Sequence, residues 1–585
     1  AIRTRPERPS VPAAAQSPPA RLPEPSLRIA VPMRDGVTLD TCVWLPAQAM
    51  PAPAILVRTP YSRTLNLGNE PPLLRYLAAG YAVVLQQIRG IGASGGHFSF
   101  NSPLDRDDGH DTVEWIATQA WCSGAVGMDG HSYAGMTQLT TAASRPPHLR
   151  CIVPAVPSLD FFREPPYLGG AFSRMHTLAW GASLQFEQLL EEAGGAFDLN
   201  GFLTQPALLA RWTSRPLRSA ADTELRGDTL QHYRDALAHP TFDAWWQQRS
   251  LMPQDFAKID LPVLVVSGNF DPSTGPLALW RGLESHAAGG DQRRLLIGPW
   301  DHNQSYVGGS SDRGPYAFGE TAQRDVVALR LAFFDRHLKQ LGPGPALDDR
   351  VTVFITGANE WRSFDRFPPL QSVSRSYFLG SEGHANSSRG DGILLDTKPA
   401  RTQPPDHFID DPEWPFVGGL THAKGPAFAL DLRERERDHD TLVYRTGPLP
   451  EALTLLGEPE LELFTTADAP DADLCAWLAE HRPDGSTTFL AMGSLRLRYH
   501  AGFDAERPIT PGETVRIRIT MTYIGHRIAA GHQLRLLVSG SNFPLVDPNP
   551  HGAGPVADAG TTQVARQTVF HDPTRPSRLI LPTLP

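Results

Sequence analysis

The sequence predicts an α/β domain with an inserted helical cap, followed by a C-terminal all-β domain of jelly-roll type. Three observations predict this fold class. Short apolar runs alternate with helix-prone segments over residues 27–160, which is typical of a parallel sheet covered on both faces. This rhythm stops over residues 161–255 and then resumes. After Gly342-Pro343-Gly344-Pro345, alternating strand patterns replace the helix signals.

The first domain opens with a hairpin and continues with buried strands. Residues 27–31 and 38–45 alternate apolar and polar side chains, at least in part, around Arg34-Asp35-Gly36, and this pattern predicts a β-hairpin. Buried strands are expected at residues 54–57, 81–85, 125–131 and 151–155, with helices at residues 73–79, 111–118 and 136–143. Strands and helices that alternate in this order favour a parallel sheet.

Residues 161–255 are predicted to form a helical cap that interrupts the α/β domain. Residues 187–193 and 230–238 are helix-prone, and Trp212, Trp245 and Trp246 supply aromatic surface. The sheet resumes with strands at residues 263–266 and 294–298, and an apolar helix at residues 325–341 closes it. The α/β domain is therefore expected to comprise residues 27–160 and 256–345.

Residues 346–585 carry the pattern of an all-β domain. Turn residues separate the strand patterns, and helix signals are nearly absent, as in a jelly-roll β-sandwich. Strands are expected at residues 351–355, 461–464, 474–478, 494–499, 515–521 and 533–538.

Composition excludes several classes of protein. The 585 residues carry a formal net charge of −10 and no Lys and Arg stripe with interleaved aromatics, which argues against a nucleic-acid partner. The sequence has no run of about 18 apolar residues, so we expect no membrane-spanning helix. Cys42, Cys122, Cys151 and Cys475 lack metal-ligand spacing and are expected to be buried thiols.

Residues 1–26 are rich in Pro, Ala and Arg and contain no apolar core of a signal peptide. We expect a flexible Pro-rich extension. A cytoplasmic location is expected, and secretion after signal cleavage stays open because the sequence begins without Met.

Ser132 has the surroundings of a nucleophile elbow. It follows the strand at residues 125–131 and precedes a helix-prone run, and small residues flank it at Gly130, Ala134 and Gly135. A tight turn between strand and helix needs such small neighbours, and it exposes the serine beside the N–H groups of the helix. Turns that contain Gly and Ser are common, so the motif needs partners before it predicts catalysis.

Asp271 and His302 are the expected partners of Ser132. A serine nucleophile needs a base, and the base needs an orienting carboxylate. On an α/β sheet these follow the serine in the order acid, then histidine, each on a loop after a strand. Asp271 follows the strand at residues 263–266, and His302 follows the strand at residues 294–298. Asp301 is an alternative acid, but a sequence neighbour rarely reaches the Nδ1 atom of the same imidazole.

An acidic group near residue 110 has two interpretations, a metal site and a helix start. It contains Asp105, Asp107, Asp108, Asp111 and Glu114. We favour the helix start, where carboxylates cap N–H groups and offset the helix dipole. His131, next to the candidate nucleophile, either tunes the site or fills the turn.

Together these motifs resemble the cocaine esterase / X-Pro dipeptidyl-peptidase family of α/β-hydrolases. The likeness runs from Leu27 over nearly all of the chain. Besides the elbow, the matching landmarks are Val31-Pro32-Met33-Arg34-Asp35-Gly36, Val57-Arg58-Thr59-Pro60-Tyr61, Arg89-Gly90 with Ser94 and Gly96, Trp121-Cys122, Gly298-Pro299-Trp300-Asp301-His302, Gly531-His532 and Ser541-Asn542-Phe543-Pro544.

The resemblance implies roles for five residues. Ser132, His302 and Asp271 would be the nucleophile, the base and the orienting acid. The Tyr61 hydroxyl and the backbone N–H of Tyr133 would form the oxyanion hole. Such a donor, aimed at developing charge, is worth about 2.7–4 kcal/mol of transition-state stabilisation.

The resemblance also implies that Trp180 lines the substrate pocket, with a core aromatic of the cap as the alternative. It implies no cofactor and no metal, a small ester or amide as substrate, no membrane partner and a homodimer. The residues after Asp271 lack the extra carboxylates with which related α-amino acid ester hydrolases bind an ammonium group.

The sequence therefore predicts a serine hydrolase that cleaves carboxylic esters, with amides as a second substrate class, through an acyl-enzyme. An X-Pro-type dipeptidyl-peptidase, an acylase or amidase, and an acyltransferase are alternatives that use the same triad. A non-catalytic binding protein whose working part is the C-terminal sandwich is the alternative from another class.

Overall fold

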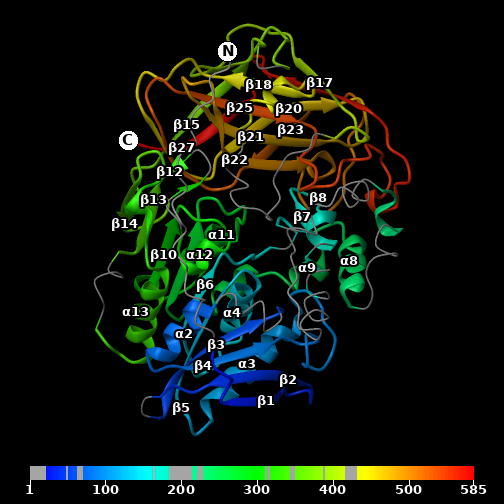
Figure 1. The fold of residues 1–585 in the computed structure, drawn as a ribbon. Helices are drawn as coiled ribbons and strands as arrows, with labels where there is room; N and C mark the ends of the chain where they lie inside the picture. Colours follow the sequence, from blue (N-terminus) through cyan, green and yellow to red (C-terminus); the bar gives the residue numbers. More distant parts are fainter. Residues whose placement is uncertain are drawn as a thin grey trace, which may run out of the picture.

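The computed structural model describes residues 22–47, 50–61, 70–160, 162–164, 166–178, 180–181, 184, 214–219, 228–309, 312–313, 316–342, 349–386, 389–415 and 431–585. Its lower part in Figure 1 is a mixed sheet with helices, and its upper part is a β-sandwich. The described cap elements lie between the two, on the right of the view. This arrangement matches the α/β-hydrolase and jelly-roll architecture that the sequence predicts.

The lower sheet has ten strands in the order β1-β2-β4-β3-β5-β6-β9-β10-β13-β14. The pairs from β4–β3 to β10–β13 are parallel, and the predicted hairpin β1–β2 is antiparallel. The strands are β1 (Leu27–Pro32), β2 (Thr38–Trp44), β3 (Ala52–Thr59), β4 (Ala82–Gln87), β5 (Cys122–His131), β6 (Leu149–Ala155), β9 (Val263–Gly268), β10 (Arg293–Gly298), β13 (Val351–Ile355) and β14 (Glu360–Phe364).

Helices cover both faces of this sheet, because its strands are apolar on both sides. One buried cluster includes Ile116 and Leu283, and another includes Tyr76 and Phe334. The helices are α2 (Glu70–Ala78), α3 (Leu104–Ala117), α4 (Tyr133–Ala143), α11 (Gly275–His286), α12 (Gln304–Val307) and α13 (Val326–Leu338).

Residues 351–355 form a strand, as predicted, but this strand belongs to the α/β sheet and not to the sandwich. These residues form β13, which pairs in parallel with β10 and places Val351 opposite Leu295. All five residues of β13 are buried. An apolar strand of this length fits either sheet, and its alternation carries no information about its partner. The α/β sheet therefore extends through β14, beyond the expected boundary at residue 345.

The acidic group lies at the start of a helix, as expected, with Asp105 and Asp107 in its first turn, but it forms ion pairs in place of the expected side-chain cap. Helix α3 begins at Leu104 after Pro103, whose position has no side-chain cap. The carboxylates therefore lie along the helix, where they face basic side chains of neighbouring segments. The pairs are Arg58–Asp105, Arg34–Asp107, Arg89–Asp108, Arg34–Asp111 and His148–Glu114.

The cap is helical in part and contains a short hairpin that the sequence did not reveal. The expected helix at residues 230–238 is α8, whereas residues 187–193 and Trp212 lie outside the described residues. The described elements are β7 (Tyr167–Leu168), β8 (Ala171–Phe172), η1 (Leu217–Ser219), α8 (Asp228–Ala238), α9 (Ala244–Gln247) and α10 (Pro253–Phe256).

The end of the predicted N-terminal extension packs against the sheet. Trp44 Nε1 donates a hydrogen bond to Pro23 O at 2.7 Å, and Leu45 N donates to Ser26 Oγ at 3.1 Å. These contacts correct the expectation of a flexible segment for residues 22–26, while residues 1–21 lie outside the described part of the chain. All four cysteines are buried and unpaired, as expected.

The C-terminal sandwich is a thirteen-stranded, mainly antiparallel assembly of jelly-roll type. None of the described helices of the chain is long and apolar enough to cross a membrane. The strands of the sandwich are β15 (Val373–Gly380), β16 (Ile393–Leu395), β17 (Asp406–Asp410), β18 (Thr441–Arg445), β19 (Leu453–Gly457), β20 (Glu460–Ala467), β21 (Asp473–His481), β22 (Thr487–Arg496), β23 (Val515–Thr520), β24 (Ile524–Ile528), β25 (Gln533–Ser539), β26 (Ala565–Phe570) and β27 (Arg578–Leu584).

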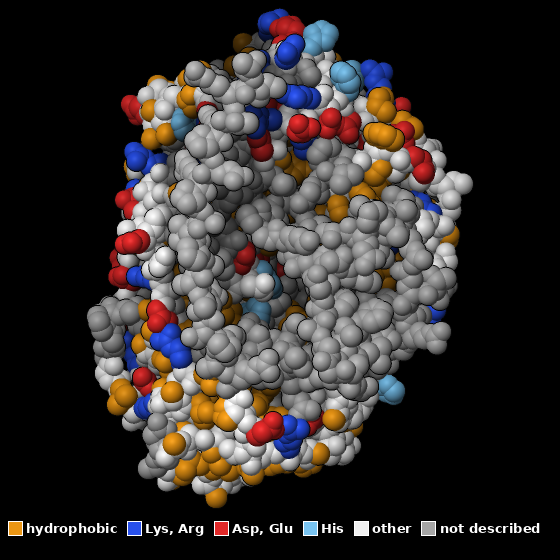
Figure 2. Space-filling model, in the orientation of Figure 1, with side chains coloured by type: hydrophobic (Ala, Val, Ile, Leu, Met, Phe, Trp, Pro, Cys, Tyr) orange, Lys and Arg blue, Asp and Glu red, His pale blue; other side chains and the backbone are white. Residues whose placement is uncertain are grey.

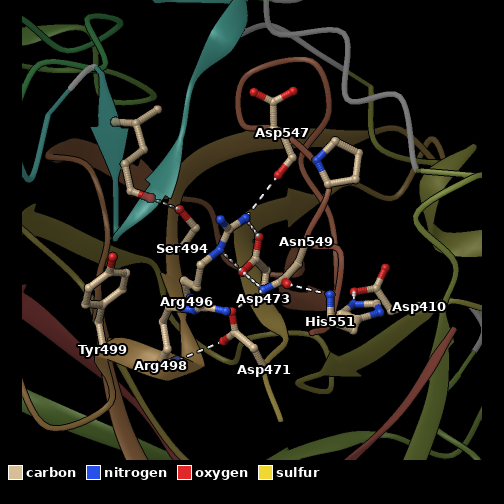
Figure 3. A network of polar contacts seen from close by, with 12 residues as sticks. Asp410, Asp471, Asp473, Ser494, Arg496, Arg498, Tyr499, Asp547, Asn549 and His551 are labelled. Carbon is tan, nitrogen blue, oxygen red and sulfur yellow. Dashed lines mark hydrogen bonds and ion pairs between the residues drawn. The ribbon is translucent and has the colours of Figure 1, made fainter. Parts of the chain in front are cut away.

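A buried ionic network lies where the sandwich meets the cap (Figure 3). Arg496 binds Asp473 through two hydrogen bonds of 2.8 Å, and Arg498 Nε donates to Asp471 at 2.6 Å. Asn549 donates to both carboxylates, at 3.0 Å and 2.8 Å. Buried charges are tolerated only when they are paired and hydrogen-bonded in this way.

The network continues into the cap through Asp547. Arg496 donates to Asp547 O at 3.1 Å, and the Asp547 carboxylate accepts from Arg174 N at 3.0 Å and pairs with Arg174 NH2 at 3.0 Å. Asp547 N also donates to Phe172 O, in the cap hairpin, at 2.8 Å. The sandwich therefore holds the cap at the segment that leads to Trp180.

Arg496→Ala is expected to destabilise the protein by about 3–5 kcal/mol, because it leaves buried carboxylates without their cation. Arg375→Ala is the matched control, since Arg375 pairs with Asp396 on the surface and that pair is worth less than about 1 kcal/mol. Urea denaturation followed by circular dichroism measures both effects. Equal losses of stability would contradict a dominant role for the buried network.

Candidate active site

Ser132 lies on a strained turn between β5 and α4. Its backbone has φ 57° and ψ −123°, a region that residues with a side chain rarely adopt. The turn closes because its neighbours are small: a Cβ atom on Gly130 would lie 2.6 Å from Ala134 Cβ. This is the geometry of a nucleophile elbow, in which the serine projects beyond the strand.

The parallel sheet brings the candidate residues to one edge. Leu56 lies opposite Met128, so the chain leaves β3 and β5 at the same level, just before Tyr61 and Ser132. Gly268 likewise lies opposite Gly298, where the chain leaves β9 and β10 toward the two partner loops. The carboxyl ends of parallel strands meet at one edge, which is where α/β proteins build their sites.

Asp271 is the carboxylate that contacts the candidate base. His302 Nδ1 lies 2.6 Å from Asp271 Oδ2, and the Asp271 side chain is 1% exposed. Phe270 N donates to Trp300 O at 2.9 Å, which ties the two loops together. The alternative acid, Asp301, accepts from Gln304 N at 2.8 Å at the start of α12.

The surroundings of His302 favour its protonated form. Burial lowers the pKa of His302, but the charge and hydrogen bond of Asp271 and the charge of Asp301 outweigh it, so the pKa is raised above 6.5. The His302 side chain stays 35% exposed. A neutral His302 with Nδ1 bound to Asp271 has Nε2 available as a base.

Tyr61, Tyr133 and Trp180 lie together beside the elbow. Trp180 Nε1 lies 3.4 Å from Tyr61 Oη, and the Trp180 and Tyr133 rings stack with centroids 5.9 Å apart. Tyr133 is the first residue of α4, where an N–H group has no acceptor within the helix. Asn101 N donates to Tyr133 Oη at 2.8 Å and holds the ring away from the site.

An aromatic wall extends from Trp180, and sequence reasoning did not find it. The Phe100 ring meets Trp180 edge-on at 5.2 Å and stacks on His232 at 4.7 Å, and Phe98 lies 6.1 Å from Trp180. Burial and the charge of Arg249 lower the pKa of His232 to about 3, so this ring is neutral at pH 7. Phe98 and Phe100 come from the loop before α3 and His232 from α8, and no local motif marks them.

His131 packs within the turn that carries Ser132. Its ring stacks on Tyr306 at 4.7 Å and lies 5.8 Å from the His302 ring. Burial and the charges of His302 and Arg330 lower the pKa of His131 to about 3, so it adds no charge to the site. A small pocket behind the elbow is lined by Val57, Tyr61, Leu73, Leu85, Gly130, His131, Ala134 and Tyr306.

Figure 2 shows histidine and acidic side chains near the middle of this face, among residues whose placement is not described. Within the described ranges, no three His, Cys, Asp or Glu side chains are grouped as metal ligands. The arrangement suits acyl transfer, with a candidate nucleophile, a candidate base, a candidate acid and candidate donors for an oxyanion.

Comparisons with known proteins agree with this architecture. Residues 35–304 match the model of the X-Pro dipeptidyl-peptidase (S15 family). Residues 346–580 match the X-Pro dipeptidyl-peptidase C-terminal non-catalytic domain. The two matches cover the parts of the chain that carry the α/β sheet and the sandwich.

Full-length relatives extend this likeness. The cocaine esterase of Rhodococcus sp. (strain MB1 Bresler) is 32% identical over 580 residues, which covers 95% of this chain and 98% of the relative. An aminopeptidase from a marine sediment archaeon of the Thaumarchaeota has a TM-score of 0.81 at 25% identity, covering 98% of this chain and all of that one. An α-amino acid ester hydrolase shares the fold, with a TM-score of 0.79 at 23% identity and the same coverage.

Asp271→Asn is expected to lower the pKa of His302 below 6.5. Without the carboxylate charge, the lowering effect of burial dominates. NMR of protein labelled with ¹³C-histidine measures this titration, and His131 should stay neutral between about pH 5 and 8 in both proteins. An unchanged His302 pKa in the variant would show that the Asp271 carboxylate does not act on the candidate base.

Proposed function

The chain belongs to the cocaine esterase / X-Pro dipeptidyl-peptidase family of serine hydrolases, and on that premise we propose that it hydrolyses carboxylic esters through an acyl-enzyme on Ser132. One observation carries the proposal. His302 Nδ1 lies 2.6 Å from the buried Asp271, at the sheet edge where the strained backbone of Ser132 ends β5.

In this mechanism His302 Nε2 takes the proton of the Ser132 hydroxyl while Oγ attacks the ester carbonyl carbon. The tetrahedral intermediate collapses, the C–O bond to the alcohol breaks, and His302 gives its proton to the leaving alcohol. Water, deprotonated by His302, then attacks the acyl carbon, the bond from that carbon to Ser132 Oγ breaks, and His302 returns the proton to Oγ as the acid leaves. Asp271 holds the imidazole orientation and stabilises its charged form.

The oxyanion is stabilised by two donors from different segments, the start of α4 and the loop after β3. The backbone N–H of Tyr133 points from the start of α4, where the helix leaves it without an acceptor. The hydroxyl of Tyr61 comes from the end of β3, and its neighbour Trp180 donates toward Tyr61 Oη, which directs the Tyr61 proton elsewhere. Preorganised donors of this kind cost no reorganisation during reaction.

The pocket favours a neutral ester with an apolar or aromatic group. Trp180 is partly buried beside Tyr61 and packs on the buried rings of Phe98 and Phe100, and His232, which stacks on Phe100, is neutral. We therefore assign Trp180 to the substrate pocket. Stacking of aromatic groups adds about 0.5–1.5 kcal/mol per ring pair to the burial of apolar area.

Peptidase, amidase and acyltransferase activities remain second candidates on the same machinery. A comparison of p-nitrophenyl esters with X-Pro p-nitroanilides distinguishes the first two from an esterase, and product analysis with an added alcohol detects transfer. The homodimer, the domain boundaries and the cytoplasmic location stay predictions.

Ser132→Ala is expected to reduce hydrolysis of p-nitrophenyl esters by at least about 10⁴-fold, because no other group can form the acyl-enzyme. Ser144→Ala, at the far end of the same helix, is the control for folding. A fluorophosphonate probe should label the wild-type enzyme and the control, and not Ser132→Ala. Equal hydrolysis by both variants would reject Ser132 as the nucleophile, and wild-type protein with no activity above the buffer rate would favour a non-catalytic protein.

Tyr61→Phe is expected to lower kcat by about 10²–10³-fold with little change in KM, because the lost hydroxyl acts mainly on the transition state. Tyr81→Phe is the matched control, since it also loses one hydroxyl, bound to Asp335 in the domain core. Steady-state kinetics on one ester measures both variants. If the decrease in kcat/KM came wholly from a higher KM, Tyr61 would not act as an oxyanion donor.

A further inference from the structure

Glu164 is a buried carboxyl next to the loop that carries Asp271. It lies in the loop after β6 and is 3% exposed. Its backbone N–H donates to Asp160 O at 3.0 Å, and Tyr167 N donates to Glu164 O at 2.9 Å, so the surrounding turn holds it in place. The mechanism proposed above does not use this side chain.

Hydrogen bonds connect Glu164 to the catalytic pair. Glu164 Oε2 lies 3.2 Å from Ser273 Oγ, and Ser273 N donates to Asp271 Oδ1 at 2.7 Å. Asp271 Oδ2 in turn contacts His302 Nδ1. Ser273 is therefore the one residue between Glu164 and the acid that orients the base.

The positions of the oxygens around Ser273 indicate where a proton must be. Ser273 Oγ lies 3.2 Å from Glu164 Oε2 and 3.4 Å from Pro157 O. A hydroxyl has one proton to donate and can accept others. Both contacts are satisfied when a neutral Glu164 donates to Ser273 Oγ and Ser273 donates to Pro157 O. An ionised Glu164 leaves one of these contacts without a proton.

The charges around Glu164 also favour its neutral form. The Asp160 carboxylate is in the same loop, and the Asp271–His302 pair lies beyond Ser273. The Arg163 guanidinium forms an ion pair with Asp160 and lies over the Phe242 ring. The leading causes of its pKa shift include no cation. Burial, helped by the charge of Asp160, raises the pKa of Glu164 to about 8, against hydrogen bonds that Ser158, Leu159 and Ser273 can donate to the ionised form.

We propose that Glu164 is a positioning residue of the hydrolase: its neutral carboxyl, acting through Ser273, holds the loop that presents Asp271 to His302, and its ionisation at alkaline pH disrupts this arrangement. The inference rests on the proposed function of this triad. A charge created here is buried without a cation, which is costly, so the loop must open to hydrate it. Asp271 then loses its fixed position against the imidazole.

The acid limb and the alkaline limb of the pH–activity profile are therefore set by different residues. Hydrolysis needs neutral His302, whose raised pKa places the acid limb above pH 6.5. It also needs neutral Glu164, which places an alkaline limb near pH 8. Activity is expected to be highest between these limits.

The test is the pH dependence of kcat/KM for an ester without titrating groups, followed in a pH-stat from about pH 5.5 to 10. Glu164→Gln keeps a neutral donor and is expected to remove the alkaline limb. Glu164→Ala should lose about 10–100-fold at every pH, because the loop is misplaced, and the glutamine variant should restore most of that loss. Circular dichroism over the same range checks that each protein stays folded.

Asp160→Asn provides a second measurement with a predicted sign. Removing this like charge lowers the pKa of Glu164, so the alkaline limb should move to lower pH. A Ser132-dependent esterase that keeps the same alkaline limb in Glu164→Gln overturns this inference alone. Hydrolysis that persists in Ser132→Ala overturns the proposed function instead.

Discussion

The strained backbone of Ser132 is the constraint on which the rest of the site depends. A residue with a side chain at φ 57° is costly, and the surrounding sheet and helix must hold it there. Gly130 and Ala134 permit the close approach of strand and helix that makes the turn possible. In return, the serine leaves the sheet at the level where Tyr61 leaves the neighbouring strand, and the N–H groups of α4 face the same space.

Burial acts on every titratable side chain of the site, and neighbouring charges decide the outcome. His131 and His302 are close together, yet the pKa of His131 falls to about 3 while that of His302 rises, because Asp271 contacts His302. Among the described residues, Glu164 forms no ion pair with a basic side chain, and its pKa rises to about 8. The loops around the elbow thus hold a neutral imidazole, a candidate base and a carboxyl with a raised pKa, and such a separation of pKa values suits acid–base chemistry near neutral pH.

The sandwich contributes to the site from a distance. Its buried network reaches Asp547, which binds Arg174 and the cap hairpin, and the chain continues from Arg174 to Trp180 (Figure 3). The position of the aromatic wall therefore depends on ion pairs in another domain. This connection gives a physical reason for a C-terminal domain that carries none of the catalytic candidates.

The sequence by itself determined the fold class, most strands and the order of nucleophile, acid and base, because these depend on local periodicity and on motifs that end each strand. It misassigned residues 351–355, since an apolar strand fits either sheet, and it took the acids of α3 for caps, since their arginine partners are distant in sequence. The sequence favoured Asp271 over Asp301 as the partner of His302, and the structure shows that contact. Only the folded chain reveals the packing of Phe98, Phe100 and His232 and the environment of Glu164. These features arise from long-range packing, and burial together with neighbouring charge sets their chemistry.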